Sequence, residues 1–208
     1  MIKIEKVETY GWEAAIRGMR NPKNSWAKSD SEMYWDGDKW DCSVGEQDLK
    51  LMKSLAAAGQ DHGKFMRMIT VTLDITAPLY WWKEFDTYKV GTVADSCSTM
   101  HKIHAKEFAM DDFSHEHLLD PEGLLADIIT DLNSWRKDYL RTQDKMYWWQ
   151  MIQLLPSSYN QKRTVQLNYA VLKNMYHARK NHKLDEWLDF CKWVESLPYS
   201  ELITEVMK

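Results

Sequence analysis

The residues best suited to chemistry in this 208-residue chain lie in two stretches. The first is residues 77–99, APLYWWKEFDTYKVGTVADSCST, which contains Lys89 and Cys97. The second follows Leu155-Pro156 and contains Lys162 and Arg179. Arginine offers an anion a planar fork of donors that are always charged, whereas lysine offers only a point charge. These residue types are compatible with a small local site for phosphate or another anion.

Each of these residues also has an ordinary structural explanation. Arg179 lies at the end of a predicted helix, where a cation is favourable without any ligand. Lys162 and Arg163 can be solvated loop charges, and Asn168 can satisfy a buried backbone group. Cys97 fits a small buried residue, because nothing in the neighbouring sequence signals an activated thiol.

Four histidines form a rival constellation. His101, His104, His115 and His117 lie within seventeen residues of one another, beside several acids. A metal ion needs such ligands to converge on one point. The pattern HxxH followed by HxH matches no closed metal template, so we expect surface or helix-capping histidines and no metal site.

Composition limits the function classes. The formal net charge is −4, from 27 basic and 31 acidic residues, which argues against a general nucleic-acid binder. The three cysteines, Cys42, Cys97 and Cys191, indicate free thiols in a reducing compartment. The first residues, MIKIEKVETYGW, have no apolar signal core, and no membrane-length apolar run follows. We therefore expect a cytoplasmic protein without a membrane partner.

Eleven tryptophans and twelve methionines are many for this length. They predict either a large core or a core plus an interface between subunits. Trp81-Trp82 and Trp148-Trp149 favour the interface, because neighbours on a helix point about 100° apart and are hard to bury together in one small domain.

Periodicity and turn residues predict the elements that must position these groups. We expect a short strand at 2–7, a helix at 11–19, a hairpin at 32–44 around Asp36-Gly37, and a helix at 47–58. Residues 69–75 alternate as a strand, and a helix from Pro78 runs to about residue 89. Residues 91–118 are predicted as loop with short helix. Asp120-Pro121 starts a helical pattern that Pro156 ends, and helices follow at 164–180 and 184–197. Together these helices and strands predict one domain over residues 1–208. Its fold class should be α+β or helix-rich α/β, with a small, mostly antiparallel sheet and long helices in the C-terminal half.

One frame of residues resembles a known signature. In this chain, seven residues separate Thr87-Tyr88-Lys89 from Cys97-Ser98-Thr99. The known signature has the same spacing: Arg-His-Arg, seven residues, then Ser-x-Arg. That signature belongs to the flavin-dependent thymidylate synthases, the ThyX family. The strand and aromatic helix before the frame, the run from Leu155-Pro156 to His182, and AIRGMRNPKNSW near the N-terminus are also similar to the family's arrangement. The likeness covers about three-quarters of the chain, outside the hairpin and residues 105–120.

The resemblance implies a set of site residues. It implies flavin contacts at Ser25, Lys89, Asn168 and His182. It implies nucleotide contacts at Glu84, Asp95, Cys97, Lys162 and Arg179. Here Lys162 replaces a family arginine, Asp95 replaces a glutamate, and His182 lies one residue closer to Arg179 than in the family. Asp95 can instead cap a turn.

The family's chemistry sets two further expectations. In ThyX enzymes, FAD passes reducing power to a methylene group carried from methylene-tetrahydrofolate to dUMP, with NADPH as co-substrate, and the subunits form homotetramers. By resemblance we expect FAD, a pyrimidine deoxynucleotide ligand and a homo-oligomer, with a tetramer favoured. Replacing two signature arginines could cost about 3–6 kcal/mol of anion binding. The chain is therefore either an active synthase, a ThyX-fold protein without synthase activity that binds another ligand or a protein partner, or an interaction protein without a small ligand.

Overall fold

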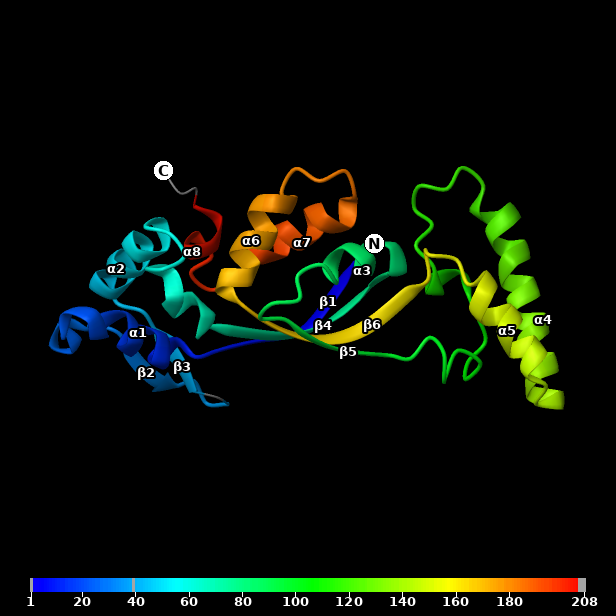
Figure 1. Cartoon of the computed structure of the whole chain (residues 1–208), viewed down its shortest axis with the longest axis horizontal. Helices are drawn as coiled ribbons and strands as arrows, with labels where there is room; N and C mark the ends of the chain where they lie inside the picture. Colours follow the sequence, from blue (N-terminus) through cyan, green and yellow to red (C-terminus); the bar gives the residue numbers. More distant parts are fainter. Residues whose placement is uncertain (1, 39, 206–208) are drawn as a thin grey trace. The chain divides into compact units, whose positions relative to one another are not determined.

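The computed structural model describes residues 2–38 and 40–205 (Figure 1). Its α-helices are α1 (Trp12–Arg20), α2 (Glu46–Ala57), α3 (Leu79–Phe85), α4 (Ala126–Thr142), α5 (Lys145–Leu154), α6 (Tyr169–Arg179), α7 (Asp185–Glu195) and α8 (Glu201–Thr204). Its strands are β1 (Lys3–Tyr10), β2 (Glu32–Trp35), β3 (Trp40–Ser43), β4 (Thr70–Pro78), β5 (Val93–Ser96) and β6 (Asn160–Asn168). Short 3-10 turns are η1 (Asn21–Lys23), η2 (Trp26–Lys28), η3 (Gly63–Arg67) and η4 (Met110–Asp112), and η5 (Pro121–Leu125) is a π turn.

The central sheet is antiparallel, with strand order β1-β4-β6-β5. Two backbone hydrogen bonds flank the β4–β6 pair: Tyr169 N donates to Ile69 O, and Leu79 N donates to Tyr159 O, each over 3.0 Å. The partner in β6 moves back along the chain as far as β4 advances, which is the sign of antiparallel pairing. The predicted α+β class with a small, mostly antiparallel sheet is thus confirmed.

The described chain forms two compact units, which we describe separately. Unit 1 comprises residues 2–5, 74–87 and 94–164. Unit 2 comprises residues 6–38, 40–73, 88–93 and 165–205. A single domain over the whole chain stays a prediction.

Unit 1 contains α3 and the paired helices α4 and α5 (Figure 1). A hydrophobic cluster in this unit includes the buried residues Phe113, Leu132 and Met151. Trp81 and Trp82 are 0% and 1% exposed, so the expectation that one domain would struggle to bury both is wrong. Their rings meet edge to face at 4.9 Å, and Trp82 Nε1 donates to Gln161 O. Trp149 is 44% exposed.

Unit 2 contains α1, α2, α6, α7, α8 and the hairpin of β2 and β3. Its buried aromatics include Trp12, which meets Tyr169 edge to face at 5.3 Å, and Trp187, which meets Phe190 at 5.6 Å.

Several predicted elements are confirmed, and the segment before α6 is not. The helices at 11–19 and 47–58, the strand at 69–75 and the hairpin at 32–44 occur close to their predicted bounds. The predicted helix at 164–180 begins only at Tyr169, because residues 160–168 form β6. Val165 and Leu167 are buried on either side of exposed Gln166, which is strand alternation. The helical spacing after Asn168 masked this shorter strand signal.

Two other helix boundaries also differ. Pro78 ends β4 and is the N-cap of α3, which stops at Phe85 and not near residue 89. The helical pattern after Asp120 is broken at Gln143, whose φ of 57° separates α4 from α5. A residue in this left-handed conformation cannot continue an α-helix.

Candidate functional site

Unit 2 contains a pocket of about 650 Å³ beside α6. The end of α2, the turn η3, residues 90–91 and α6 as far as His177 surround it. Its lining residues are Ala56, Gly59, Gln60, Gly63, Met66, Arg67, Val90, Gly91, Asn168, Ala170, Val171, Lys173, Asn174 and His177. The volume lies within the usual range for small-molecule and cofactor sites.

The charges of this pocket favour an anion. Arg67 and Lys173 are among its lining residues, and none of the lining residues within 2–38 and 40–205 is a carboxylate. Lys173 Nζ donates to Ala56 O over 3.0 Å, and burial lowers the pKa of this lysine. Burial and the neighbouring Lys180 also lower the pKa of His177. A cationic wall with amide neighbours and no acid suits a phosphorylated or otherwise anionic ligand.

Asn168 stands where β6 turns into α6, at the edge of the pocket. Its Oδ1 accepts from Val171 N over 3.1 Å, so the side chain caps α6 as the alternative explanation expects. Gly91, with φ +77°, packs against it: a Cβ there would meet Asn168 Nδ2 at 3.0 Å and Val171 Cγ2 at 3.1 Å. The loop and the cap therefore form one tight corner of the pocket.

Arg179 ends α6 and is held by two aromatic residues. Its Nε donates to Tyr88 OH over 2.9 Å. Its guanidinium lies 4.9 Å from the ring centre of Trp187 and 5.6 Å from that of Tyr88. His182 lies nearby, with its ring centre 6.3 Å from Trp187 and its Nδ1 accepting from Leu184 N. The structure thus joins Arg179 to the middle residue of the Thr87-Tyr88-Lys89 frame.

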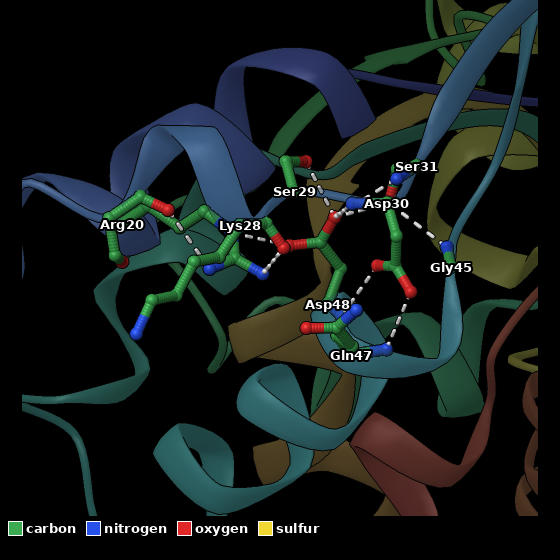
Figure 2. Close-up of polar contacts among 9 residues, drawn as sticks. Arg20, Lys28, Ser29, Asp30, Ser31, Gly45, Gln47 and Asp48 are labelled. Carbon is green, nitrogen blue, oxygen red and sulfur yellow. Dashed lines mark hydrogen bonds and ion pairs between the residues drawn. The ribbon is translucent and has the colours of Figure 1, made fainter.

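Ser25 lies in the loop between η1 and η2, and a buried ion pair fixes this loop (Figure 2). Arg20 Nε donates to Asp48 Oδ1 over 2.6 Å, while the other guanidinium nitrogens donate to Ser25 O and Lys28 O. Asp48 Oδ2 accepts from the hydroxyl of Ser29 and from both the hydroxyl and the backbone N–H of Ser31. Ser25 is half-buried and does not line the pocket beside α6.

The remaining predicted residues of unit 1 lie around β5 and β6. Lys162 Nζ pairs with Asp74 over 2.8 Å, so this cation has a carboxylate partner. Cys97 is exposed, its N–H donates to Lys162 O, and its carbonyl accepts from Gln161. It borders a smaller pocket of about 290 Å³ with Lys102 and Lys106.

Three residues complete the survey of predicted positions. Glu84 is half-buried in α3, Asp95 is exposed on β5, and Lys89 is exposed after Tyr88. Of the predicted residues, the structure brings Asn168 to the pocket of unit 2 and gathers Arg179 with His182 around Trp187.

Sequence reasoning missed three pocket residues, Arg67, Lys173 and His177. Lys173 and His177 are four residues apart on α6, one turn from each other on the same face. Their spacing, following the Asn168 cap, is the signal that could have identified them.

Solved structures resemble this chain over its whole length. The flavin-dependent thymidylate synthase ThyX from Helicobacter pylori, complexed with FAD and dUMP, matches with a TM-score of 0.73 at 16% identity, covering 99% of this chain and 100% of that one. A second structure of ThyX from the same organism, with FAD and dUMP, gives 0.72 at 16% identity and 99% of each chain. This chain has the ThyX fold.

A pyrimidine methylase shares this ThyX fold. The UMP/dUMP methylase PolB from Streptomyces cacaoi, bound with 5-Br dUMP, matches with a TM-score of 0.62 at 14% identity, covering 98% of this chain and 95% of that one. No protein-family model and no curated protein matches the sequence. At these identities the likeness establishes the fold, so the resemblance found in the sequence is confirmed at that level.

Two features that other functions would require are absent from the described residues. No helix within residues 2–38 and 40–205 is long and apolar enough to cross a membrane. Over the same residues, no group of three or more His, Cys, Asp or Glu side chains could hold a metal ion.

Proposed function

We propose that this ThyX-fold protein binds FAD in the pocket beside α6. The observation that carries the proposal is that Arg67 and Lys173 both line this pocket, while no carboxylate of the described part of the chain does. FAD has a diphosphate that requires cationic donors and a ring system that requires apolar contact, which Met66, Val90 and Val171 offer. The ThyX of Helicobacter pylori has the same fold and is complexed with FAD.

The two cations of the pocket compensate for what the signature frame lacks. Thr87 and Thr99 stand where the signature has arginines, Tyr88 stands at its histidine, and Arg179 is engaged with Tyr88 and Trp187. A hydrogen bond to a charged group contributes about 1.5–3 kcal/mol, so each pocket cation can restore about one to two decades of affinity.

A titration of FAD into the purified protein tests this proposal. We expect saturable binding, followed by flavin absorbance and fluorescence, and weakening by about tenfold in Lys173→Met and in Arg67→Met. Lys180→Met is the matched control, because Lys180 is exposed at the C-cap of the same helix, outside the pocket lining. Absence of FAD binding to soluble protein, or equal affinity in all three variants, would refute the proposal.

As a second step we propose that the substrate is a pyrimidine deoxynucleotide and that the reaction is its reductive methylation. The support is that two proteins with this fold are complexed with dUMP or its 5-bromo analogue. Bound FAD would supply reducing equivalents, with NADPH and methylene-tetrahydrofolate as co-substrates. Arg179, half-buried beside Tyr88, is the residue best placed to bind the nucleotide.

Exchange of hydrogen at C5 of dUMP separates the active enzyme from its alternative. An active protein with FAD, NADPH and methylene-tetrahydrofolate should release the C5 hydrogen and support thymidine-free growth of bacteria that lack thymidylate synthase. FAD binding without exchange, with soluble protein and no growth, would favour the ThyX-fold protein without synthase activity. We also propose a homotetramer in the cytoplasm; light scattering that gives the monomer mass would contradict that assembly.

A further inference from the structure

The hairpin of β2 and β3 has an apolar face that extends beyond the part of unit 2 that covers it. The hairpin forms a two-stranded sheet of its own. Its register pairs Met33 with Cys42 and Trp35 with Trp40. Side chains alternate between the faces of a strand, so these four residues share one face.

Exposure increases along this face from the base of the hairpin to its tip. Cys42 is 7% exposed, Met33 is 41% exposed, and Trp35 and Trp40 are 55% and 66% exposed. The two indoles meet edge to face at 5.9 Å. Two neighbouring tryptophans with this much exposed surface form a patch of the kind found at protein interaction sites.

A pocket of about 240 Å³ continues the face at its base. Met33 and Cys42 form one side of it, Ile16 of α1 forms another, and the half-exposed Trp26 lies at its rim. Arg20, Ser29 and Ser31 also line it, and the buried Arg20–Asp48 network fixes all three (Figure 2). Because its polar wall is already hydrogen-bonded, this pocket is preformed for an apolar side chain.

The charges around this face are mostly negative. Asp36 and Asp38 lie between the two strands, and Glu13 and Glu32 line the pocket, whereas Asp41 pairs with Tyr34 on the opposite face. The cation among the lining residues that is not buried, Arg17, lies 3.6 Å from Glu13. The sequence adds one lysine to the hairpin, Lys39, which lies outside the described residues.

We propose that the face formed by Met33, Trp35 and Trp40, together with its pocket, docks a basic segment of a partner protein. Arginine side chains stack on exposed indoles and pair with the surrounding carboxylates, while one bulky apolar side chain fills the pocket. A second copy of this chain is a poorer occupant, since two acidic hairpins repel each other and the chain carries a net charge of −4. This proposal is independent of the flavin site.

Titration with a short synthetic peptide that alternates arginine and leucine tests the proposal. We expect saturable binding by calorimetry, weakened by added salt, and no binding of the same peptide with glutamate in place of arginine. Trp35→Phe and Trp40→Phe should each weaken binding by about twofold to fivefold while keeping an aromatic ring at the tip. Glu32→Gln with Asp38→Asn should weaken it without touching the apolar face.

Matched variants in other places control for general effects. Trp149→Ala removes an exposed tryptophan that also has an edge-to-face neighbour, Trp148. Asp61→Asn with Glu107→Gln removes the same charge at exposed positions that belong neither to the hairpin nor to the lining of its pocket. Both controls should bind the peptide as the original chain does. The proposal is overturned if the arginine peptide does not bind, if the controls lose binding equally, or if Trp40→Phe lowers the oligomer mass.

Discussion

Arg179 and Tyr88 are joined by a 2.9 Å hydrogen bond from the guanidinium Nε to the phenol oxygen. Tyr88 is the middle residue of the frame that resembles Arg-His-Arg, and Arg179 is the residue for which the resemblance implies nucleotide binding. In this chain the hydroxyl of Tyr88 therefore accepts a hydrogen bond from one of the N–H groups of Arg179. The guanidinium also lies 4.9 Å from the ring centre of Trp187, so this second aromatic contact helps to orient its plane.

Replacing Tyr88 with phenylalanine tests what this bond does. The free energy of unfolding should fall by about 1 kcal/mol, because one hydrogen bond is lost while the ring contact with Arg179 remains. The affinity for dUMP should stay equal or rise, since Nε becomes available, whereas Arg179→Met should weaken it about tenfold. Chemical denaturation and nucleotide titration measure both effects. Tyr147→Phe is the control, and weaker dUMP binding by Tyr88→Phe alone would mean that the hydroxyl itself contacts the nucleotide.

Gly91→Ala should lower both the stability of the protein and its affinity for FAD. Its φ of +77° makes any Cβ unfavourable by about 1–2 kcal/mol, and the new methyl group would press on Asn168 and Val171. Gly37 is a suitable control, because its φ is +107° and a Cβ there meets nothing within 4 Å. Thermal unfolding should show a lower midpoint temperature for both variants, with the larger decrease in Gly91→Ala. FAD affinity should fall only in Gly91→Ala; an equal fall in Gly37→Ala would contradict this role of the corner.

The sequence predicts the parts of the fold that local patterns specify. The strand at 69–75 alternates strictly, and Val71, Leu73 and Ile75 are all fully buried. The Asp36-Gly37 pair predicts the hairpin because glycine readily adopts the positive φ that a turn needs, and Gly37 has a φ of 107°. The strand β6 escaped prediction because its apolar residues, Val165 and Leu167, run directly into the helical spacing of α6.

The candidate site is less predictable, since it depends on residues far apart in the chain. Arg67 lies in a short turn with no motif of its own, and it reaches the pocket only through the packing of η3 against α6. The tertiary partner of Lys162 is Asp74, which the spacing of a linear motif cannot reveal. The resemblance to ThyX identified the frame around Tyr88, but the partner role of its hydroxyl appears only in three dimensions.

FAD affinity should depend on pH through Lys173. Burial lowers the pKa of this lysine below its ordinary value of 10.5, and an anion binds the protonated form better. The affinity should therefore be constant at lower pH and decrease as the pH rises through the lowered pKa of Lys173. Lys173→Arg should flatten this decrease, because arginine keeps its charge. The unfolded chain holds the proton more tightly, so the free energy of unfolding should rise with pH over the same window. An unchanged pH profile in Lys173→Arg would exclude this lysine as the titrating group.

Asp48→Asn in α2 should strongly destabilise the loop that contains Ser25. Asp48 and Arg20 are 0% and 4% exposed, and loss of the carboxylate leaves a buried guanidinium without its counter-ion, which costs about 3–5 kcal/mol. Burial alone would raise the pKa of Asp48, but hydrogen bonds from Ser29, Ser31, Arg20 and the backbone of Asp30 outweigh it and the pKa is lowered.

That lowered pKa gives the prediction for Asp48 a pH signature. The carboxylate contributes stability above its ordinary pKa of 3.8, and this contribution is lost as the pH falls through the lowered value. Acid titration of the unfolding free energy should therefore show a shallower slope below about pH 4 in Asp48→Asn than in the original chain. Asp61→Asn, at an exposed position, should leave both the stability and the slope nearly unchanged. If Asp48→Asn lowers the free energy of unfolding by less than about 1 kcal/mol, the ion pair does not hold the loop. Structural relaxation or water must then stabilise the buried charge of Arg20 in place of the carboxylate.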